Sequence, residues 1–396
     1  MPSNPQFVIR TFNYRLLPTK RQHEVLNKLL DDQRILYNAG LEERIGAYRT
    51  TGKGRSFVDQ SKAVTEWRKA DEGARSCPVN LQRWTLRRLD DAFNAFVHRA
   101  KSKQEKAGFP RFRSATRWKS FGFAEFSGIQ LIDNRLVFKS MASGLRVHFH
   151  RSLPKDPDIR SCTFTKGIKG WRVGFQVKLP VQPLEPTGKE VGIDLGISTL
   201  AALSDGVNVV NKRPAEKQQA ELRRRQRALA RCRKGSKRRK KVKKMVTRCH
   251  EKIKNTRTTY LHQVSAQLVG DYDLIAVEKL NVKGLAKGIL SKQVHDASWG
   301  RLLGFIRYKA EGAGKRVIEV DPRYTSQICP GCGVIKAKKL SERIHRCDGC
   351  GLVLDRDTAA ARVILGRAVV GPGVVNVGSL IPCVDSEISG LRGISN

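Results

Sequence analysis

The sequence predicts an α+β protein of several domains, and three observations support this fold class. Residues 1–186 combine helical periodicity with short alternating runs, whereas residues 187–365 contain apolar strands that end in acidic side chains. Three prolines between positions 180 and 186 mark a linker, and two cysteine pairs interrupt the second part. The length of 396 residues fits about two or three domains.

The N-terminal elements begin with a strand, because residues 7–15 alternate apolar and polar side chains. Thr19 and Gln22 have the spacing of a capping box, and leucines then recur at helical spacing. A further helix is predicted over residues 81–100. We therefore expect a helical module over about residues 19–107.

Short strands are predicted after the motif Gly108-Phe109-Pro110-Arg111-Phe112-Arg113, with turn-like breaks between them. The predicted strands cover residues 129–132, 135–139, 145–150, 162–165 and 171–179. With the first strand they suggest a small antiparallel β-barrel formed by about residues 1–18 and 108–182. The helical module is then an insertion into this barrel.

The charge of the chain restricts its function. Lys and Arg number 76 against 36 Asp and Glu, a net charge of +40, and like-charge repulsion on this scale destabilises a compact state. Nucleic acid is the polymer that this composition favours as a partner, and a merely basic surface is the alternative. Because 40% of the residues are hydrophobic, the chain is not a disordered basic tail.

Positive charge is most concentrated in the basic helical segment at about residues 215–260. Within Lys217–Arg257, 19 of 41 residues are Lys or Arg and two are acidic. Sparse apolar residues predict a helical hairpin with a break near Gly235-Ser236. A charge run can be a solvated face, but nearly uniform sign favours a segment that contacts phosphates.

Acidic side chains occur on three apolar strands. Asp194 lies within the first, Glu278 ends the second, and Asp355 and Asp357 follow the third. A buried carboxylate is costly unless it is paired or bound to a cation. Together these acids indicate a Mg²⁺ site, where two ions about 4 Å apart can hold a phosphodiester. The alternative is that each acid is an independent helix cap or salt-bridge partner.

Two C-x2-C pairs, Cys329 with Cys332 and Cys347 with Cys350, have the spacing of a zinc ribbon over about residues 325–352. Each pair is followed by Gly, which lets the backbone fold around a tetrahedral ion. Four thiolates leave no open coordination position, so the predicted zinc is structural. Two disulfides are the alternative, which an odd total of nine cysteines and a reducing compartment disfavour.

Several other side chains receive structural interpretations. Asp296 has the position of an N-cap for a helix that starts near Trp299. Trp118, Phe121 and Phe123 are weak candidates for stacking on nucleic acid bases, and a place in the core is the favoured interpretation.

The two ends of the chain give no sign of secretion or membrane insertion. The start lacks the layout of a signal peptide. The uncharged stretch Ala368–Val384 contains Pro and Gly and is too short to span a membrane. We therefore expect a flexible tail over residues 366–396, no membrane partner and a cytoplasmic protein.

In its motifs the chain resembles TnpB, the family of transposon-encoded (OrfB-type) RNA-guided DNA nucleases related to the type V CRISPR effectors. Taken in this order, the motifs form a specific combination that extends over most of the chain. They are Tyr14–Thr19, Gly108–Phe112, Gly192–Gly196, Val277–Gly284, Thr325–Gln327 and Arg356-Asp357.

The resemblance implies that residues 187–365 form a RuvC-like nuclease domain of RNase H fold, with the zinc ribbon inserted before the last acidic motif. Asp194, Glu278 and Asp357 match the family's catalytic carboxylates. The family's last motif, D-x-D-x-N-A-A-x-N-I, uses its second Asp as ligand, whereas the residues alone do not separate Asp355 from Asp357. By the same resemblance, the barrel and helical module hold guide RNA and recognise a short motif beside target DNA.

The chain departs from the family at Ala359 and Val363, which replace the two Asn of the last motif. Such outer-shell amides can support a metal site. The leading hypothesis is an RNA-guided DNA endonuclease that uses Mg²⁺. A guided repressor without cleavage is the alternative that the missing Asn favour, and a strand-transfer transposase fits the zinc ribbon less well.

Overall fold

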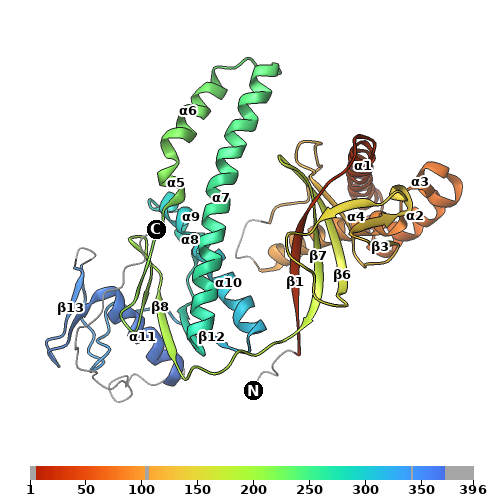
Figure 1. Ribbon diagram of the computed structural model, residues 1–396. Helices are drawn as coiled ribbons and strands as arrows, with labels where there is room; N and C mark the ends of the chain where they lie inside the picture. Colours follow the sequence, from red (N-terminus) through yellow and green to blue (C-terminus); the bar gives the residue numbers. More distant parts are fainter. Residues whose placement is uncertain (1–5, 103–106, 340–341, 371–396) are drawn as a thin grey trace. The chain divides into compact units, whose positions relative to one another are not determined.

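The computed structural model describes residues 6–102, 107–339 and 342–370. These residues divide into two compact units, one formed by Phe7–Pro180 and the other by Gln6 together with the described residues from Val181 onward (Figure 1). Each unit has its own hydrophobic core. Among the described residues, no helix combines the length and apolar character that a membrane crossing requires.

The N-terminal unit is built on a curled antiparallel sheet of seven strands in the order β2-β6-β7-β1-β5-β4-β3. The strands are β1 (Phe7–Leu16), β2 (Ser120–Phe123), β3 (Ile129–Ile132), β4 (Arg135–Phe138), β5 (Leu145–His148), β6 (Asp158–Gly167) and β7 (Gly170–Pro180). The five predicted runs and the first strand are present, and β2 was not predicted. No pairing within the described residues joins β2 to β3, so closure into a barrel stays a prediction.

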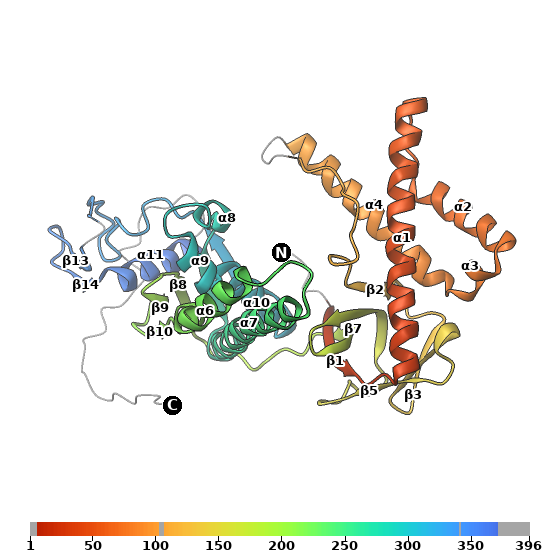
Figure 2. The ribbon, with the colours of Figure 1, turned by 90° about the horizontal axis from the view of Figure 1, so that it is seen from above.

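Four helices separate β1 from β2 along the chain. They are α1 (Lys20–Thr51), α2 (Phe57–Ala70), α3 (Glu72–Ser76) and α4 (Val79–Ser102). The capping box at Thr19 and Gln22 is confirmed, and Figure 2 shows α1 and α4 crossing. A short 3-10 turn, η1 (Lys139–Met141), follows β4. The leucines of α1 and α4 pack against the aromatic side chains of the sheet.

The favoured interpretation of three aromatic side chains as core residues is confirmed, and the weaker alternative that they stack on bases is wrong. Trp118, Phe121 and Phe123 are at most 1% exposed and belong to the core of the N-terminal unit. Phe121 stacks on Phe164 with ring centres 5.1 Å apart. Phe121 and Phe123 lie two residues apart on β2 and so share its inward face, while Trp118 precedes the strand, and the burial of all three rings leaves no face for a ligand.

The C-terminal unit contains a five-stranded sheet in the order β10-β9-β8-β11-β12. The strands are β8 (Glu190–Asp194), β9 (Thr199–Leu203), β10 (Asn208–Val210), β11 (Leu274–Glu278) and β12 (Arg316–Val320). Strands β8, β11 and β12 are parallel, and β9 and β10 extend the sheet in antiparallel fashion. Strand β12 was not predicted.

Helices cover both faces of this sheet. α7 (Lys237–Asp271) and α10 (Trp299–Gly312) pack on one face around Val191, Ile193 and Val277. α11 (Arg356–Val370) packs on the other face through Ile364 (Figure 1). The sheet is thus the middle layer of a three-layer α/β arrangement, in which strand ends are the usual place for a functional site.

The predicted basic hairpin is confirmed. After the short α5 (Pro214–Lys217), α6 (Gln219–Ala230) runs beside α7, and Figure 1 shows the pair extending from the sheet of its unit. The break falls at Gly235, whose φ is +85°, and the Ser236 side chain caps α7. Glycine accepts this left-handed backbone without steric cost.

The N-cap interpretation of Asp296 is wrong. Asp296 lies inside α9 (Ser291–Ala297), which follows α8 (Val282–Leu285), and Ser298 with a φ of +55° precedes α10. The Asp296 carboxylate is buried and accepts the backbone N–H of Ala215 at 3.1 Å and Arg257 Nη2 at 2.6 Å. It therefore fastens the base of the basic hairpin, a contact between distant segments that spacing cannot reveal.

The last described elements of the chain are a small two-stranded ribbon and a helix. Strands β13 (Ile344–Arg346) and β14 (Val353–Asp355) pair in antiparallel fashion, and α11 follows directly. Residues 366–370, predicted to belong to a flexible tail, are helical because α11 continues to Val370 and packs on the sheet. The remainder of the predicted tail, residues 371–396, lies outside the described residues.

Candidate metal centres

Two of the predicted acids lie side by side at the ends of parallel strands. β8 and β11 are in register through Ile193 and Val277, so Asp194 and Glu278 each follow one residue after this pair. Carboxyl ends of parallel strands meet at the same edge of a sheet. Two chain segments more than eighty residues apart thus place their carboxylates at one edge.

The third acid reaches this edge because α11 packs closely on β8. A Cβ atom on Gly192 would lie 2.0 Å from the carbonyl oxygen of Ala361, so only Gly permits this approach. Gly192 lies two residues before Asp194, and Asp357 lies one turn of α11 before Ala361. The packing therefore brings the first turn of α11, with Asp357, toward the end of β8.

Asp355 and Asp357 have different roles in the structure. The Asp355 carboxylate accepts the backbone N–H of Asp357 at 3.0 Å and of Thr358 at 3.1 Å, which makes it the cap of α11. The charge of Asp357 acts on Asp194, and its carboxylate lies 3.4 Å from the Arg356 guanidinium. The local backbone thus occupies the Asp355 carboxylate, while the charge of Asp357 is the one that acts on Asp194.

Burial and mutual repulsion make this group of acids electrostatically strained. Burial, followed by the charges of Glu278 and Asp357, raises the pKa of Asp194 to about 7, and Arg356 opposes the shift. Burial also raises the pKa of Glu278, against a hydrogen bond from Thr325 and the charge of Arg367. A bound cation would relieve this strain, because it favours the charged form of every neighbouring carboxylate.

Neighbouring segments hold the turn that follows Asp194. The Trp299 indole donates to the carbonyl of Gly196 at 3.2 Å, and the Asn211 amide donates to that of Ile197 at 2.8 Å. The sequence indicated Trp299 only as part of an apolar helix face. Its support for the Asp194 turn was missed, because a side-chain bond across 103 positions leaves no local pattern.

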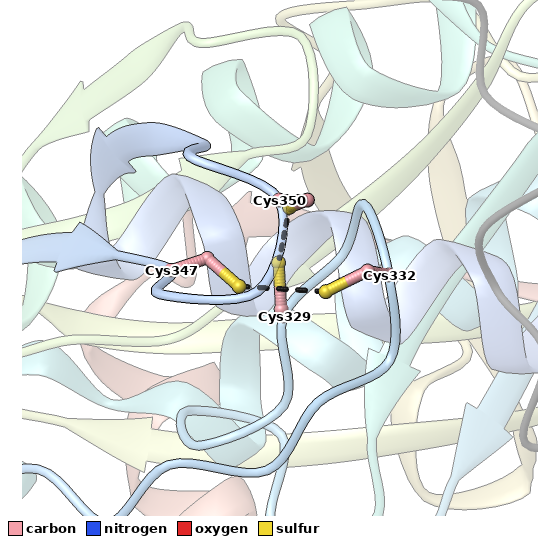
Figure 3. A group of neighbouring side chains, drawn as sticks. All are labelled: Cys329, Cys332, Cys347 and Cys350. Carbon is pink, nitrogen blue, oxygen red and sulfur yellow. Dashed lines mark hydrogen bonds between the residues drawn. The ribbon is translucent and has the colours of Figure 1, made fainter.

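The four predicted cysteines form one compact cluster (Figure 3). All four sulfurs lie within 4.8 Å of one another, with 3.6 Å between Cys329 and Cys350 and 3.4 Å between Cys332 and Cys347. All four are free thiols. A tetrahedral ZnS₄ centre with bonds of about 2.3 Å has sulfur–sulfur edges of about 3.8 Å, so the cluster is compatible with zinc.

The two cysteine pairs build the cluster from matching turns. In the first pair, the Cys329 sulfur accepts N–H groups from Gly331 and Cys332. In the second, the N–H groups of Cys350 and Gly349 lower the pKa of Cys347. Each turn ends in a glycine with a left-handed backbone, as predicted, at φ values of +78° and +73°. Burial raises the pKa of Cys329 to about 12 against its two N–H donors, whereas the N–H groups around Cys347 favour its thiolate.

The carboxylates are less tightly gathered than the sulfurs. Among the described residues, the cysteines form the one group of three or more possible metal-ligand side chains whose donor atoms all lie within 4.8 Å of one another. The structure therefore brings Asp194, Glu278 and Asp357 to one sheet edge as an open set. Their oxygen donors still suit Mg²⁺, which keeps several waters and needs few protein ligands.

Basic grooves lie in both units. On α6, four Arg and two Ala line an open groove of about 610 Å³. Arg223, Arg227 and Arg231 follow one another at intervals of about 6 Å along this helix. No ion pair of the described residues neutralises these three side chains, whereas Glu221 pairs with Arg224. Such a row of unpaired cations is suited to a polyanion.

In the N-terminal unit, a cavity of about 360 Å³ lies between α2, α4 and the segment after β2. Lys62, Arg83 and Arg87 supply positive charge, and Asn80 supplies an amide. The Arg87 guanidinium lies 4.3 Å from the centre of the Phe57 ring. The cavity thus combines cations with a group able to form paired hydrogen bonds to a base edge.

Models of known protein families match most of these segments. A model described as "Probable transposase" (OrfB_IS605) matches residues 174–288, and the Cas12f1-like TNB domain matches residues 299–364. The first range contains Asp194 and Glu278, and the second contains the cysteine cluster and Asp357. A helix-turn-helix model matches residues 7–53, which fold here as β1 and α1.

Whole-chain relatives agree with the family models. A protein of Streptomyces pristinaespiralis described as "Putative RNA-guided DNA endonuclease" is 34% identical over 374 residues, which cover 92% of this chain and 90% of that protein. InsQ of Escherichia coli, with the same description, is 26% identical, and the match covers 92% of this chain and 94% of InsQ.

A solved structure supports the fold. A Cas12f1 chain in a cryo-EM complex with sgRNA and target DNA has a TM-score of 0.61 at 14% identity, covering 87% of this chain and 83% of that one. The fold, together with the matching family models and relatives, places this chain in the class of transposon-encoded nucleases. It belongs to the TnpB family of RNA-guided DNA endonucleases.

Proposed function

We propose that this protein is an RNA-guided DNA endonuclease of a mobile element that acts in the cytoplasm on DNA beside a short recognition motif. The observation that carries the proposal is that Asp194 and Glu278 end adjacent parallel strands and that the charge of Asp357 acts on Asp194, in a chain of +40 charge. Relatives described as RNA-guided DNA endonucleases support it over most of the chain length.

The carboxylates would hold Mg²⁺ in a RuvC-like site. Two bound ions supply Lewis acidity to the phosphodiester and a more acidic water. Asp194 and Asp357 would bind the ions directly, and Glu278 would complete their coordination and orient the attacking water. The raised pKa values of Asp194 and Glu278 support this role, because they mark acids whose charged forms lack compensation from the protein.

The guide supplies sequence specificity by base pairing, and the protein grips the nucleic acid backbone. The row of arginines on α6 supports a contact to phosphates, which adds affinity without reading sequence. The cavity with Asn80, Arg83 and Arg87 supports recognition of the short flanking motif by base edges. A closed N-terminal barrel and the helices α1–α4 would then form the part that holds guide RNA and reads the motif.

The cysteine cluster would hold one structural zinc. Four sulfurs leave no coordination position for substrate, so this ion would fix the ribbon and take no part in hydrolysis. The ribbon lies directly before α11 in the chain, and its folding therefore supports the placement of Asp357.

The decisive experiment uses the protein purified together with its bound RNA. Matched and mismatched DNA duplexes are incubated with this complex in the presence and absence of Mg²⁺, beside an Asp194→Ala variant. Cleavage that needs the match, the metal and Asp194 is the expected result. Guide-independent cleavage, or cleavage unchanged in the variant, would refute the proposal.

A guided repressor without cleavage is the second candidate, and one observation favours it. Ala359 and Val363 of α11 are buried, at 2% and 0% exposed, and neither carries an amide that could support the acids. Tight guided binding with no cleavage in the same experiment would identify a repressor. Joining of strands would instead identify a transposase.

A further inference from the structure

Thr325 connects the two metal centres. Its hydroxyl lies 2.5 Å from Oε1 of Glu278, and the two side chains are only 5% and 9% exposed. Of the described residues, Thr325 is the one whose side chain donates a hydrogen bond to this carboxylate. A short bond from a buried hydroxyl to a buried carboxylate is strong, because water does not compete for either partner.

The segment around Thr325 is short and fixed at both ends. On one side, β12 pairs with β11, and Lys279 N–H donates to the Val320 carbonyl at 2.8 Å. On the other side, Ile328 N–H donates to the Tyr324 carbonyl at 3.0 Å, and Cys329 N–H donates to the Val334 carbonyl at 2.9 Å. Only three residues therefore lie between Thr325 and Cys329, the first cysteine of the cluster.

The backbone at Tyr324 has a strained conformation that sets the direction of the turn before Thr325. Tyr324 has a φ of +61°, a left-handed conformation that a side chain with a Cβ adopts at a cost. Nearby, the Asp321 carboxylate accepts a hydrogen bond from Arg323 Nε. The backbone carbonyl of Asp321 accepts another from Arg367 Nη1 at 2.5 Å. These contacts anchor the turn that presents Thr325 to Glu278.

We propose that Thr325 is a positioning residue that holds Glu278 by one oxygen, leaves the other for a divalent cation shared with Asp194, and transmits folding of the cysteine cluster to that site. The proposal rests on the nuclease function proposed above. Outer-shell partners of metal ligands typically change metal affinity by about 10–100-fold. Loss of the hydroxyl should therefore weaken divalent-cation affinity by about tenfold while the chain stays folded.

The test compares Thr325→Val, which keeps the shape and removes the hydroxyl, with Thr325→Ser, which keeps the hydroxyl. Ser326→Ala is the matched control, because this neighbouring side chain is exposed. Each protein is purified with its RNA, and Mn²⁺ binding is measured by electron paramagnetic resonance. The Asp194→Asn variant of the same complex supplies the baseline for ions bound to RNA.

The expected result is about tenfold weaker specific Mn²⁺ binding in the Val variant, with affinity restored in the Ser variant and unchanged in the control. The Mg²⁺ concentration for half-maximal cleavage should rise in parallel. Zinc content should stay at one per chain. Equal Mn²⁺ affinity in the Val variant and the unmodified protein would overturn the proposal.

Coupling between the two centres has its own readout. Cys347→Ser should weaken Mn²⁺ binding in the unmodified background and have little further effect in the Thr325→Val background, because one contact carries both losses. Additive effects would overturn the coupling. If Asp194→Ala is inactive and Thr325→Val is unchanged, only this inference fails, whereas an active Asp194→Ala variant contradicts the nuclease function itself.

Discussion

The cysteine cluster and the carboxylate edge belong to the same unit and are built in opposite ways. The sulfurs come from two local turns, and all lie within 4.8 Å of one another. The carboxylates come from β8, β11 and α11, and they meet only because two parallel strands align and a helix packs on a glycine. Local turns produce a closed ligand set, whereas long-range packing produces an open one.

This difference is what separates a structural ion from a reactive one. Four sulfurs would satisfy the whole coordination sphere of a zinc ion. Burial, followed by the charges of Glu278 and Asp357, raises the pKa of Asp194 to about 7. Open positions and uncompensated charge leave room for water and phosphate, and closed coordination excludes both.

The largest expected effect separates the two neighbouring aspartates of the carboxylate edge. Asp357→Asn should reduce cleavage on the order of 10³-fold, because it removes a charged metal ligand worth several kcal/mol in the transition state. Asp355→Asn should retain cleavage, since Asn caps a helix as well as Asp does. Rates are measured on guide-matched DNA. The reverse pattern of activities would assign the metal to Asp355.

The next effect concerns the closed cluster. Cys347→Ser should lower zinc from one ion per chain to none and unfold the ribbon, because structural zinc supplies the folding free energy of such small modules. Zinc content is measured by mass spectrometry and unfolding by thermal denaturation. Cys232→Ser is the control, since Cys232 is a free thiol apart from the cluster. Retained zinc and unchanged unfolding would show that the cluster does not need a metal.

A smaller effect tests whether close packing assembles the open edge. Gly192→Ala should destabilise the protein by about 1–3 kcal/mol, because the new methyl group meets the Ala361 carbonyl and displaces α11. Cleavage should fall more than guided binding. Gly270→Ala in α7, where a Cβ meets nothing within 4 Å, should be neutral or stabilising. Equal denaturation midpoints and cleavage rates for both variants would argue against the packing account.

The smallest effect concerns pH and the charge of Asp194. Because the folded pKa is raised above its ordinary value of about 4, protonation favours the folded state, and stability falls as pH rises toward about 7. Without Mg²⁺, Asp194→Asn should therefore be more stable than the unmodified protein at pH 8, with the difference vanishing near pH 4. The check is denaturant unfolding across this range, and a difference independent of pH would contradict it.

Patterns that act locally were predictable from the sequence. The capping box at Thr19, the break at Gly235 and the two cysteine turns all depend on residues within a few positions of one another. Their outcome is set by hydrogen bonds and backbone conformations that a short segment contains in full. The cysteine spacing therefore indicated four ligands without knowledge of the fold.

Contacts between distant segments were not predictable in the same way. Asp296 was expected to cap a helix and instead fastens the basic hairpin. The spacing of residues along the sequence cannot reveal a hydrogen-bond partner that lies about eighty residues away. Strand β12, which leads to Thr325, was also missed, since its burial depends on pairing with β11.

The amino-acid sequence by itself determined the charge, the spacing of the four cysteines and the presence of acidic side chains at the ends of three apolar strands. The tertiary structure decided that Asp355 caps α11 while Asp357 turns toward Asp194, and that Thr325 reaches Glu278. The physical reason is that residue type and spacing fix which bonds are possible locally. Register between parallel strands and close packing at Gly192 fix which distant groups actually meet.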